Sequence, residues 1–179
     1  MKYSEVIHFW FEELSPQDWW KKSDNLDNQI KQRFLDLHKS AAAGELFHWR
    51  SEADGRLAEI IVLDQFSRNI FRDQPQAFAH DGMALALSQE AVSNGIHNEF
   101  ADSKLSFLIM PYMHSESPKI HEIAMDLFSA PGLESNLDFE KKHKQIIDRF
   151  GRYPHRNKIL GRTSTPEETE FLKQKGSSF

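Results

Sequence analysis

The stretch LDQFSRN, residues 63–69, places charged side chains where a helical pattern calls for apolar ones. Steps of four, three, four and three residues put five side chains on one helix face: Leu57, Ile61, Asp64, Arg68 and Phe71. Burying a charge costs several kcal/mol unless it is paired. We therefore expect Asp64 and Arg68, one turn apart, either to pair and hold the helix packing or to face a shared polar cavity with Gln65 and Asn69.

The stretch PYMHSESP brings an imidazole and a carboxylate together on one turn. We expect Pro111 to end one helix and Pro118 to begin the next, which leaves a polar turn of His114, Ser115 and Glu116. One interpretation is structural: a serine caps the following helix, and Glu116 favours its positive end. It does not account for His114, which beside a carboxylate could perform acid–base chemistry.

The stretch RFGRYPHRN, residues 149–157, gathers positive or titratable groups in an acidic chain: Arg149, Arg152, His155 and Arg156. Gly151 predicts the end of a helix, where one or two cations could cap free carbonyls. Four such groups exceed that need. Either they close over an anionic ligand through bidentate contacts, or they pin the C-terminal segment to acidic groups such as Asp64 or Glu116.

The chain offers no metal motif. His121-Glu122 begins like a metalloprotease helix, but Met125 stands where the second histidine belongs. His143 shares a face with apolar residues and is predicted to be a core histidine. The absence of cysteine excludes disulfides, zinc–thiolate sites and thiol nucleophiles. We expect no metal and no cofactor.

Composition predicts one soluble domain over residues 1–179. With 39% apolar residues, including 14 Phe and 4 Trp, the chain can build an aromatic core. A net charge of -5 argues against broad nucleic-acid binding, and no run approaches the roughly 18 apolar residues of a membrane span. The lack of cysteine is compatible with a reducing compartment, so we expect a cytoplasmic location. Oligomeric state is not predicted.

The elements that must position these groups are predicted to be helices, about seven to nine, without a sheet. The clearest stripe steps by four, four, three and four residues before Gly44: Leu26, Ile30, Phe34, Leu37 and Ala41. Other stripes run over residues 57–71, 77–92, 102–110, 118–128 and 138–149. Thr165 and Glu168 form a capping box, and Ser15-Pro16 and Ser117-Pro118 offer further helix starts. We expect a flexible tail over residues 174–179.

Three stretches together resemble a bacterial family of uncharacterised proteins, domain of unknown function nine-two-four. They are LDQFSRNIFR, PYMHSE and RFGRYPHRNKILGRTSTPEETEFL, and the N-terminal HFWFEEL fits the same pattern. The resemblance covers residues 6–172. One departure is Ser67, where the family pattern has proline, so a kink or helix end near Phe66 is in question.

The resemblance implies an all-α fold like that of tetratricopeptide (TPR) repeats and implies no established reaction. The motif residues that it carries over are Asp64, Gln65, Phe66, Arg68, Asn69, His114, Ser115, Glu116, Arg149, Gly151, Arg152, Pro154, His155, Arg156, Asn157, Gly161 and Arg162.

Three functional hypotheses follow. The first is a site for a small anionic ligand, with His114, Glu116 and His155 as catalytic candidates. Its ligand-binding candidates are Asp64, Gln65, Arg68, Asn69, Arg149, Arg152 and Arg156. The second is a protein-interaction module that takes an acidic peptide or chain terminus, for which exposed tryptophans among Trp10, Trp19, Trp20 and Trp49 would be anchors. The third is a purely structural ion-pair network.

Overall fold

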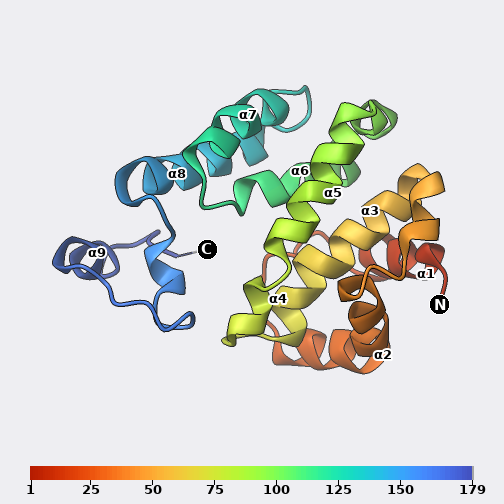
Figure 1. Ribbon diagram of the computed structural model, residues 1–179, viewed down its shortest axis with the longest axis horizontal. Coiled ribbons are helices and arrows are strands. Elements are labelled where there is room, and N and C mark those ends of the chain that lie inside the picture. The colour runs from red at the N-terminus through yellow and green to blue at the C-terminus, as the bar shows by residue number, and fades with distance from the viewer. Residues whose placement is uncertain (179) are drawn as a thin grey trace.

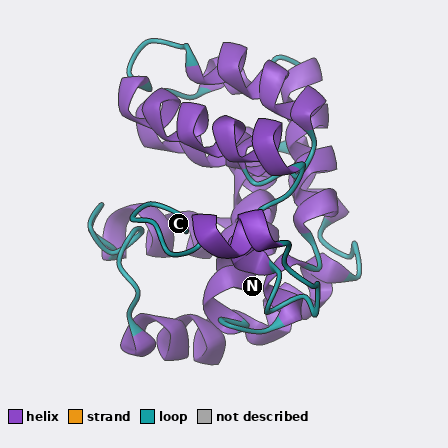
Figure 2. Ribbon diagram, turned by 90° about the vertical axis from the view of Figure 1, so that its left-hand side faces the viewer, coloured by secondary structure: helices purple, strands orange, loops and turns teal. Residues whose placement is uncertain are grey.

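The computed structural model describes residues 1–178, and within them the chain forms helices and no strand (Figures 1 and 2). The all-α prediction is confirmed. The α-helices are α1 Tyr3–His8, α2 Asp24–Ala42, α3 Ala53–Ile61, α4 Ser67–Ile70, α5 Asp81–Ser93, α6 Asp102–Met113, α7 Pro118–Phe128, α8 Glu134–Phe150 and α9 Pro166–Phe171. The TPR-like arrangement implied by the resemblance stays a prediction.

Shorter helical turns connect these helices. Two are π-helices, η1 Phe9–Glu13 and η3 Val62–Phe66. Four are 3₁₀ turns, η2 Phe47–Ser51, η4 Pro75–Phe78, η5 Ile96–Glu99 and η6 Pro154–Arg156. None of the helices in the described part of the chain is both long and apolar enough to cross a membrane.

The core is aromatic and lies where α1, α2, α3 and α6 pack together. Phe34 on α2 meets Phe66 with ring centroids 4.8 Å apart, and Trp10 meets Phe107 on α6 at 5.4 Å. All five residues of the stripe predicted before Gly44 are buried in α2. Of the tryptophans, Trp10 and Trp49 are buried, whereas Trp20 is 61% exposed.

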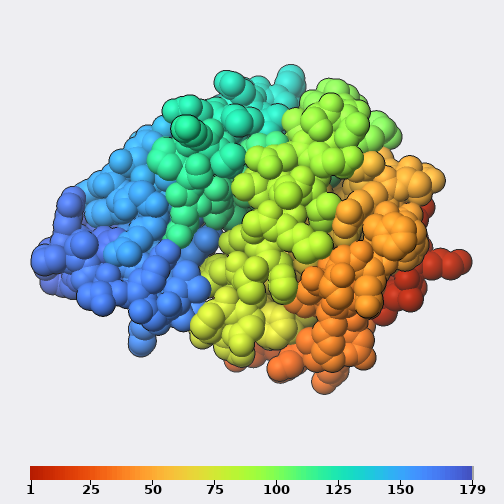
Figure 3. All heavy atoms as spheres, viewed as in Figure 1, coloured from red at the N-terminus to blue at the C-terminus, as the bar shows by residue number. Residues whose placement is uncertain are grey.

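The C-terminal segment forms a second layer against the first six helices. In Figure 1, α7, α8 and α9 lie on the left, facing α4 and α5, and Figure 3 shows the blue C-terminal atoms in contact with the yellow-green surface before α5. The capping box of Thr165 and Glu168 is present at the start of α9. In the tail, Ser177 Oγ donates to the Leu172 carbonyl at 3.2 Å, and Phe179 lies outside the described residues.

Three predicted boundaries were wrong. Pro111 does not end α6, which continues to Met113. A proline fixes a helical φ and removes one N–H, and near-complete burial of the last turns offsets that loss. Ser15-Pro16 begins no helix, because Asp18 accepts from both the backbone N–H and the hydroxyl of Ser15 and closes a turn.

The third concerns the stripe over residues 77–92. It divides into η4 and α5, and α5 begins only at Asp81. The carbonyl of Ala77, which a continuous helix would pair with its own backbone, accepts from Arg68 Nη1 at 2.8 Å instead. Because of this interruption, Asp81 lies in the first turn of α5, where it pairs with Arg68 and Arg156.

Ser67 begins α4 without a break from η3, so the helix does not end near Phe66. Its hydroxyl donates to the Leu63 carbonyl at 2.6 Å and lies 2.7 Å from His38 Nε2. The preceding turn, η3, is a π-helix that contains Asp64 and Gln65. Such turns insert one residue into a helix and are frequent at functional sites.

Candidate functional site

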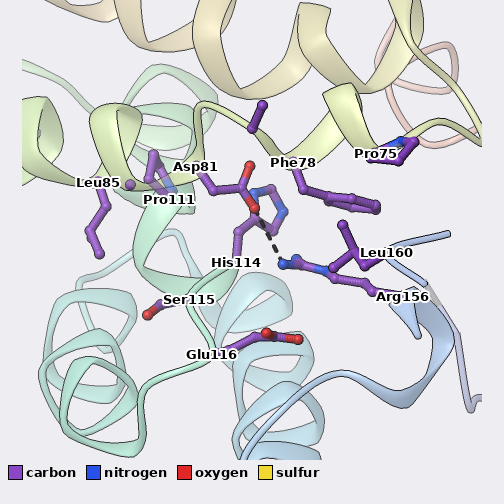
Figure 4. A pocket seen from close by; sticks show the side chains of 12 residues that line it. Pro75, Phe78, Asp81, Leu85, Pro111, His114, Ser115, Glu116, Arg156 and Leu160 are labelled. Atoms are coloured by element: carbon purple, nitrogen blue, oxygen red, sulfur yellow. Dashed lines mark hydrogen bonds and ion pairs between the residues drawn. The ribbon is translucent and has the colours of Figure 1, made fainter. Parts of the chain in front are cut away.

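A pocket of about 350 Å³ lies between η4 with α5, the end of α6, and the C-terminal segment (Figure 4). Its apolar walls are Phe78, Leu85, Pro111 and Leu160. Its polar lining comes from Asp81, His114, Ser115, Glu116 and Arg156. The second and third of the three motif stretches therefore meet here, although residues 117–148 separate them in the sequence.

Asp64 is the buried anchor of the site. Its carboxylate is 1% exposed, and it lies 2.7 Å from His114 Nδ1, accepts from Gln65 Nε2 at 2.6 Å and lies 3.4 Å from Arg68 Nη2. Burial by itself raises the pKa of this carboxyl, but the charges of His114 and Arg68 outweigh burial and hold the pKa well below its usual range. Asp64 is therefore ionised and acts only as an acceptor.

Arg68 connects two carboxylates. Besides lying near Asp64, it donates from Nη1 and Nη2 to Asp81 at 3.0 and 3.1 Å. Its remaining contacts are the Ala77 carbonyl and the ring of Phe78, 5.3 Å from the guanidinium carbon. The predicted pair of Asp64 and Arg68 is thus present, but Asp81, which the sequence analysis did not single out, is the closer, bidentate partner.

Arg156 is a buried guanidinium with few partners. Its side chain is 8% exposed and lies between two aromatic rings, with Phe78 at 4.7 Å and Tyr153 at 4.6 Å. Within residues 1–178 it makes one hydrogen bond, from Nη1 to Asp81 at 3.2 Å, and its Nε has no partner. Burial lowers the pKa of Arg156, and the nearby positive charge of Arg68 lowers it further.

Glu116 is fully occupied by the C-terminal segment. It accepts from Arg162 Nη1 and Nη2 at 2.6 and 2.9 Å and from the Tyr153 backbone N–H at 2.8 Å. Burial opposes ionisation, but these donors together lower the pKa of Glu116. The predicted docking of the segment on Glu116 is present, through Arg162, whereas Arg156 reaches Asp81 rather than Asp64.

Three of the candidate ligand-binding residues lie away from the pocket. Arg152 makes a bidentate pair with Glu168 at 2.7 and 2.8 Å, and Arg149 pairs with exposed Glu167. Asn69 donates to Asp27 of α2 at 2.8 Å. These contacts hold α9 to the end of α8 and α4 to α2.

His155 and Gln65 do not line the pocket, but each is next in sequence to a residue of the site. His155 is adjacent in sequence to Arg156, and burial lowers its pKa to about 4, with the charge of Arg156 contributing. Gln65 donates to Asp64 and contacts Met110 Sδ at 3.3 Å. His143, predicted to be a core histidine, is 7% exposed, and its Nδ1–H donates to the Phe139 carbonyl at 2.8 Å.

Sequence reasoning missed Asp81, Phe78 and Leu160. Asp81 is an ordinary acidic residue in the first turn of a helix, and nothing in its local sequence distinguishes it. No group of three or more metal-ligating side chains that could hold a metal ion is present among residues 1–178.

The family description "Bacterial protein of unknown function (DUF924)" matches residues 6–176. The chain belongs to this family. A solved structure, "Structure of Protein of Unknown Function ATU0120 from Agrobacterium tumefaciens", is 35% identical, with a TM-score of 0.91 over 96% of each chain. A comparison with curated proteins found no match. Neither the family nor this relative is described by an activity, so the function is argued from the site.

Proposed function

We propose that the pocket binds a small organic anion, with Arg156 as the group that contacts the negative charge. The observation that supports this proposal is the guanidinium itself, which is 8% exposed, has one hydrogen bond and lines the pocket. A desolvated cation with unsatisfied donors gains free energy when an anion fills them. A carboxylate suits a guanidinium because the two groups can form parallel hydrogen bonds.

The charges around the pocket favour a ligand with one negative charge. Arg68, Arg156 and Arg162 are matched by three carboxylates, those of Asp64, Asp81 and Glu116. Because two of these carboxylates also line the pocket, a polyanion such as a nucleotide triphosphate would be repelled. The apolar walls indicate that the rest of the ligand is apolar, and 350 Å³ lies at the small end of ligand pockets.

An acidic peptide, the other partner that the sequence suggested, would have to place its carboxylate in this same pocket. The pocket volume favours a free small molecule. We propose a cytoplasmic location, which the absence of cysteine supports.

The experiment is a thermal-shift and calorimetric screen of the purified full chain. The panel contains short-chain carboxylates such as butyrate and hexanoate, inorganic phosphate and nucleotides. A ligand at about 100 times its dissociation constant adds roughly 2.7 kcal/mol to the unfolding free energy. We expect the carboxylates to raise Tm and the nucleotides to have no effect.

Two variants localise the binding. Arg156→Met removes the charge but keeps most of the volume, so it should abolish the shift and leave the ligand-free stability within about 1 kcal/mol of the wild type. Arg149→Met is the matched control, since it removes an arginine of the same stretch that pairs with exposed Glu167 outside the pocket. Carboxylates that fail to bind, or that bind Arg156→Met as well as the wild type, would refute the proposal.

A further inference from the structure

His114 is held in one orientation by a buried carboxylate, which anion binding by Arg156 does not require. Its Nδ1 lies 2.7 Å from the Asp64 carboxylate, and its side chain, 16% exposed, lines the pocket. Because Asp64 is ionised and only accepts, Nδ1 carries the proton. In the neutral imidazole, Nε2 therefore keeps its lone pair, and Nε2 has no hydrogen bond within the described residues.

The buried carboxylate is costly, and the fold is adapted to hold it. Asp64 is 1% exposed, and it lies on the π-helix η3 with Gln65 donating to its second oxygen. A site that only bound an anion would need Arg156 and would gain nothing from a carboxylate behind the histidine. A buried Asp that fixes a histidine tautomer and stabilises the imidazolium is, by contrast, what acid–base catalysis by histidine uses.

The surroundings of His114 restrict the reaction to one proton-transferring group. Both oxygens of Glu116 are bonded to Arg162, and one also accepts from a backbone N–H, so this carboxylate is not available as a second acid or base. The hydroxyl oxygen of Ser115 accepts from the Ser117 N–H, and no hydrogen bond joins Ser115 to His114 in the part of the chain described. The chain has no cysteine. The nucleophile that His114 can activate is therefore water.

We propose that His114 is the general base of a hydrolase that acts on a small carboxylic ester bound in this pocket. The proposal rests on the proposed anion site, because the carboxylate product of such a reaction is the ligand that Arg156 suits. Figure 4 shows the imidazole and the guanidinium among the side chains that line the pocket, with Arg156 joined to Asp81.

The step balances without a cofactor. His114 Nε2 takes a proton from water as the water oxygen forms a bond to the ester carbonyl carbon, and the carbonyl oxygen becomes an oxyanion that Arg156 stabilises. The intermediate then collapses, the bond from carbon to the alkoxy oxygen breaks, and the leaving alkoxide takes the proton from Nε2. The products are an alcohol and a carboxylic acid, which loses its proton to solvent. Asp64 stays ionised throughout and is a positioning residue.

The test is hydrolysis of p-nitrophenyl butyrate by the purified full chain, followed by the release of p-nitrophenolate. We expect His114→Gln to lower kcat/KM by about 100-fold or more while butyrate still raises its Tm. The matched control is His8→Gln. His8 also lies 2.8 Å from a carboxylate, that of Glu12, but both side chains are more than half exposed and outside the pocket. This variant should hydrolyse the ester at the wild-type rate.

The outcomes separate the two proposals. A wild-type rate that equals that of His114→Gln overturns the hydrolase proposal, and butyrate binding by the same sample leaves the anion site intact. If butyrate does not bind, the anion-site proposal is refuted, and the hydrolase proposal that rests on it is refuted as well. Should His114→Gln not fold, the wild type still decides: butyrate must inhibit hydrolysis competitively, and hydrolysis that butyrate does not inhibit occurs elsewhere and overturns the proposal.

Asp64→Asn tests the positioning role. A purely structural role would change stability and leave the pH dependence of kcat/KM unaltered. We expect instead that the loss of the carboxylate changes the pH dependence of kcat/KM and lowers kcat more than it changes KM.

Discussion

Asp64 is the residue whose replacement gives the most direct test of the polar network. Its carboxylate is 1% exposed and has three neighbours, His114 at 2.7 Å, Gln65 at 2.6 Å and Arg68 at 3.4 Å. Removing one partner of a buried, paired charge typically costs about 3–5 kcal/mol. Asparagine keeps one acceptor of the same shape, and Arg68 keeps its bidentate pair with Asp81. We therefore expect about 2–3 kcal/mol for Asp64→Asn, the size of a charge-assisted hydrogen bond, and more for Asp64→Ala.

The assay is urea unfolding at pH 7, with the free energy of unfolding extrapolated to water. Asp138→Asn is the matched control. Asp138 pairs with Lys141 at 3.0 Å, but its side chain is 69% exposed, so its replacement should change stability by less than about 0.5 kcal/mol.

The pH dependence gives a second, independent check. The pKa of Asp64 in the folded protein lies well below its usual range. Its stabilising effect is therefore fully present above the unfolded pKa, near 3.9, and is lost as the pH falls toward the folded pKa. The difference between the wild type and Asp64→Asn should shrink as the pH falls below about 5, where Asp64 begins to lose its charge in the unfolded chain. A difference under 0.5 kcal/mol at pH 7, or one that grows as the pH falls below about 5, would refute this account of Asp64.

Further predictions concern the stability of the fold. Burial lowers the pKa of His38 and His155 to about 4 and that of His143 to about 3. The unfolded chain therefore binds more protons than the folded one below pH 6.5, and stability should fall by up to about 2 kcal/mol per histidine between pH 7 and 5. An unchanged urea midpoint at pH 5 would contradict this. Glu59→Ala leaves Arg50 without its buried bidentate partner and should cost about 3 kcal/mol in urea unfolding without affecting butyrate binding. Gly55→Ala makes a Cβ clash with the Trp49 carbonyl oxygen and should lower stability by about 3 kcal/mol, whereas the Cβ of Gly82→Ala meets no atom and should not destabilise. Equal Tm values for these two variants would refute the packing of η2 against α3.

Several elements could be predicted because their signals are local. The stripe from Leu26 to Ala41 needs only a helical period to define its buried face, and α2 buries that face. The box of Thr165 and Glu168 needs only four residues, and it begins α9. The pairing of Asp64 with Arg68 likewise follows from one helical turn, and the two lie 3.4 Å apart.

Most of the errors have a common cause, since they depend on a partner from another helix; the turn at Ser15-Pro16, which Asp18 closes locally, is the exception. Helix α6 continues through Pro111 because its last turns are buried by other helices. The helix expected over residues 77–92 is interrupted because Arg68 takes the Ala77 carbonyl. Arg149 and Arg152 were predicted to bind a ligand, but they pair with Glu167 and Glu168 of α9.

The sequence by itself determined the all-α fold and the buried helix faces. It also indicated the three stretches in which the polar residues gather. It could not decide which arginine is left unsatisfied. That depends on long-range pairing: Glu116 takes Arg162, Glu168 takes Arg152, and Asp81 is shared between Arg68 and Arg156. Charge complementarity alone permits many such pairings, and tertiary packing selects one. That packing places Arg156 between two aromatic rings, in the same pocket as a histidine oriented by Asp64.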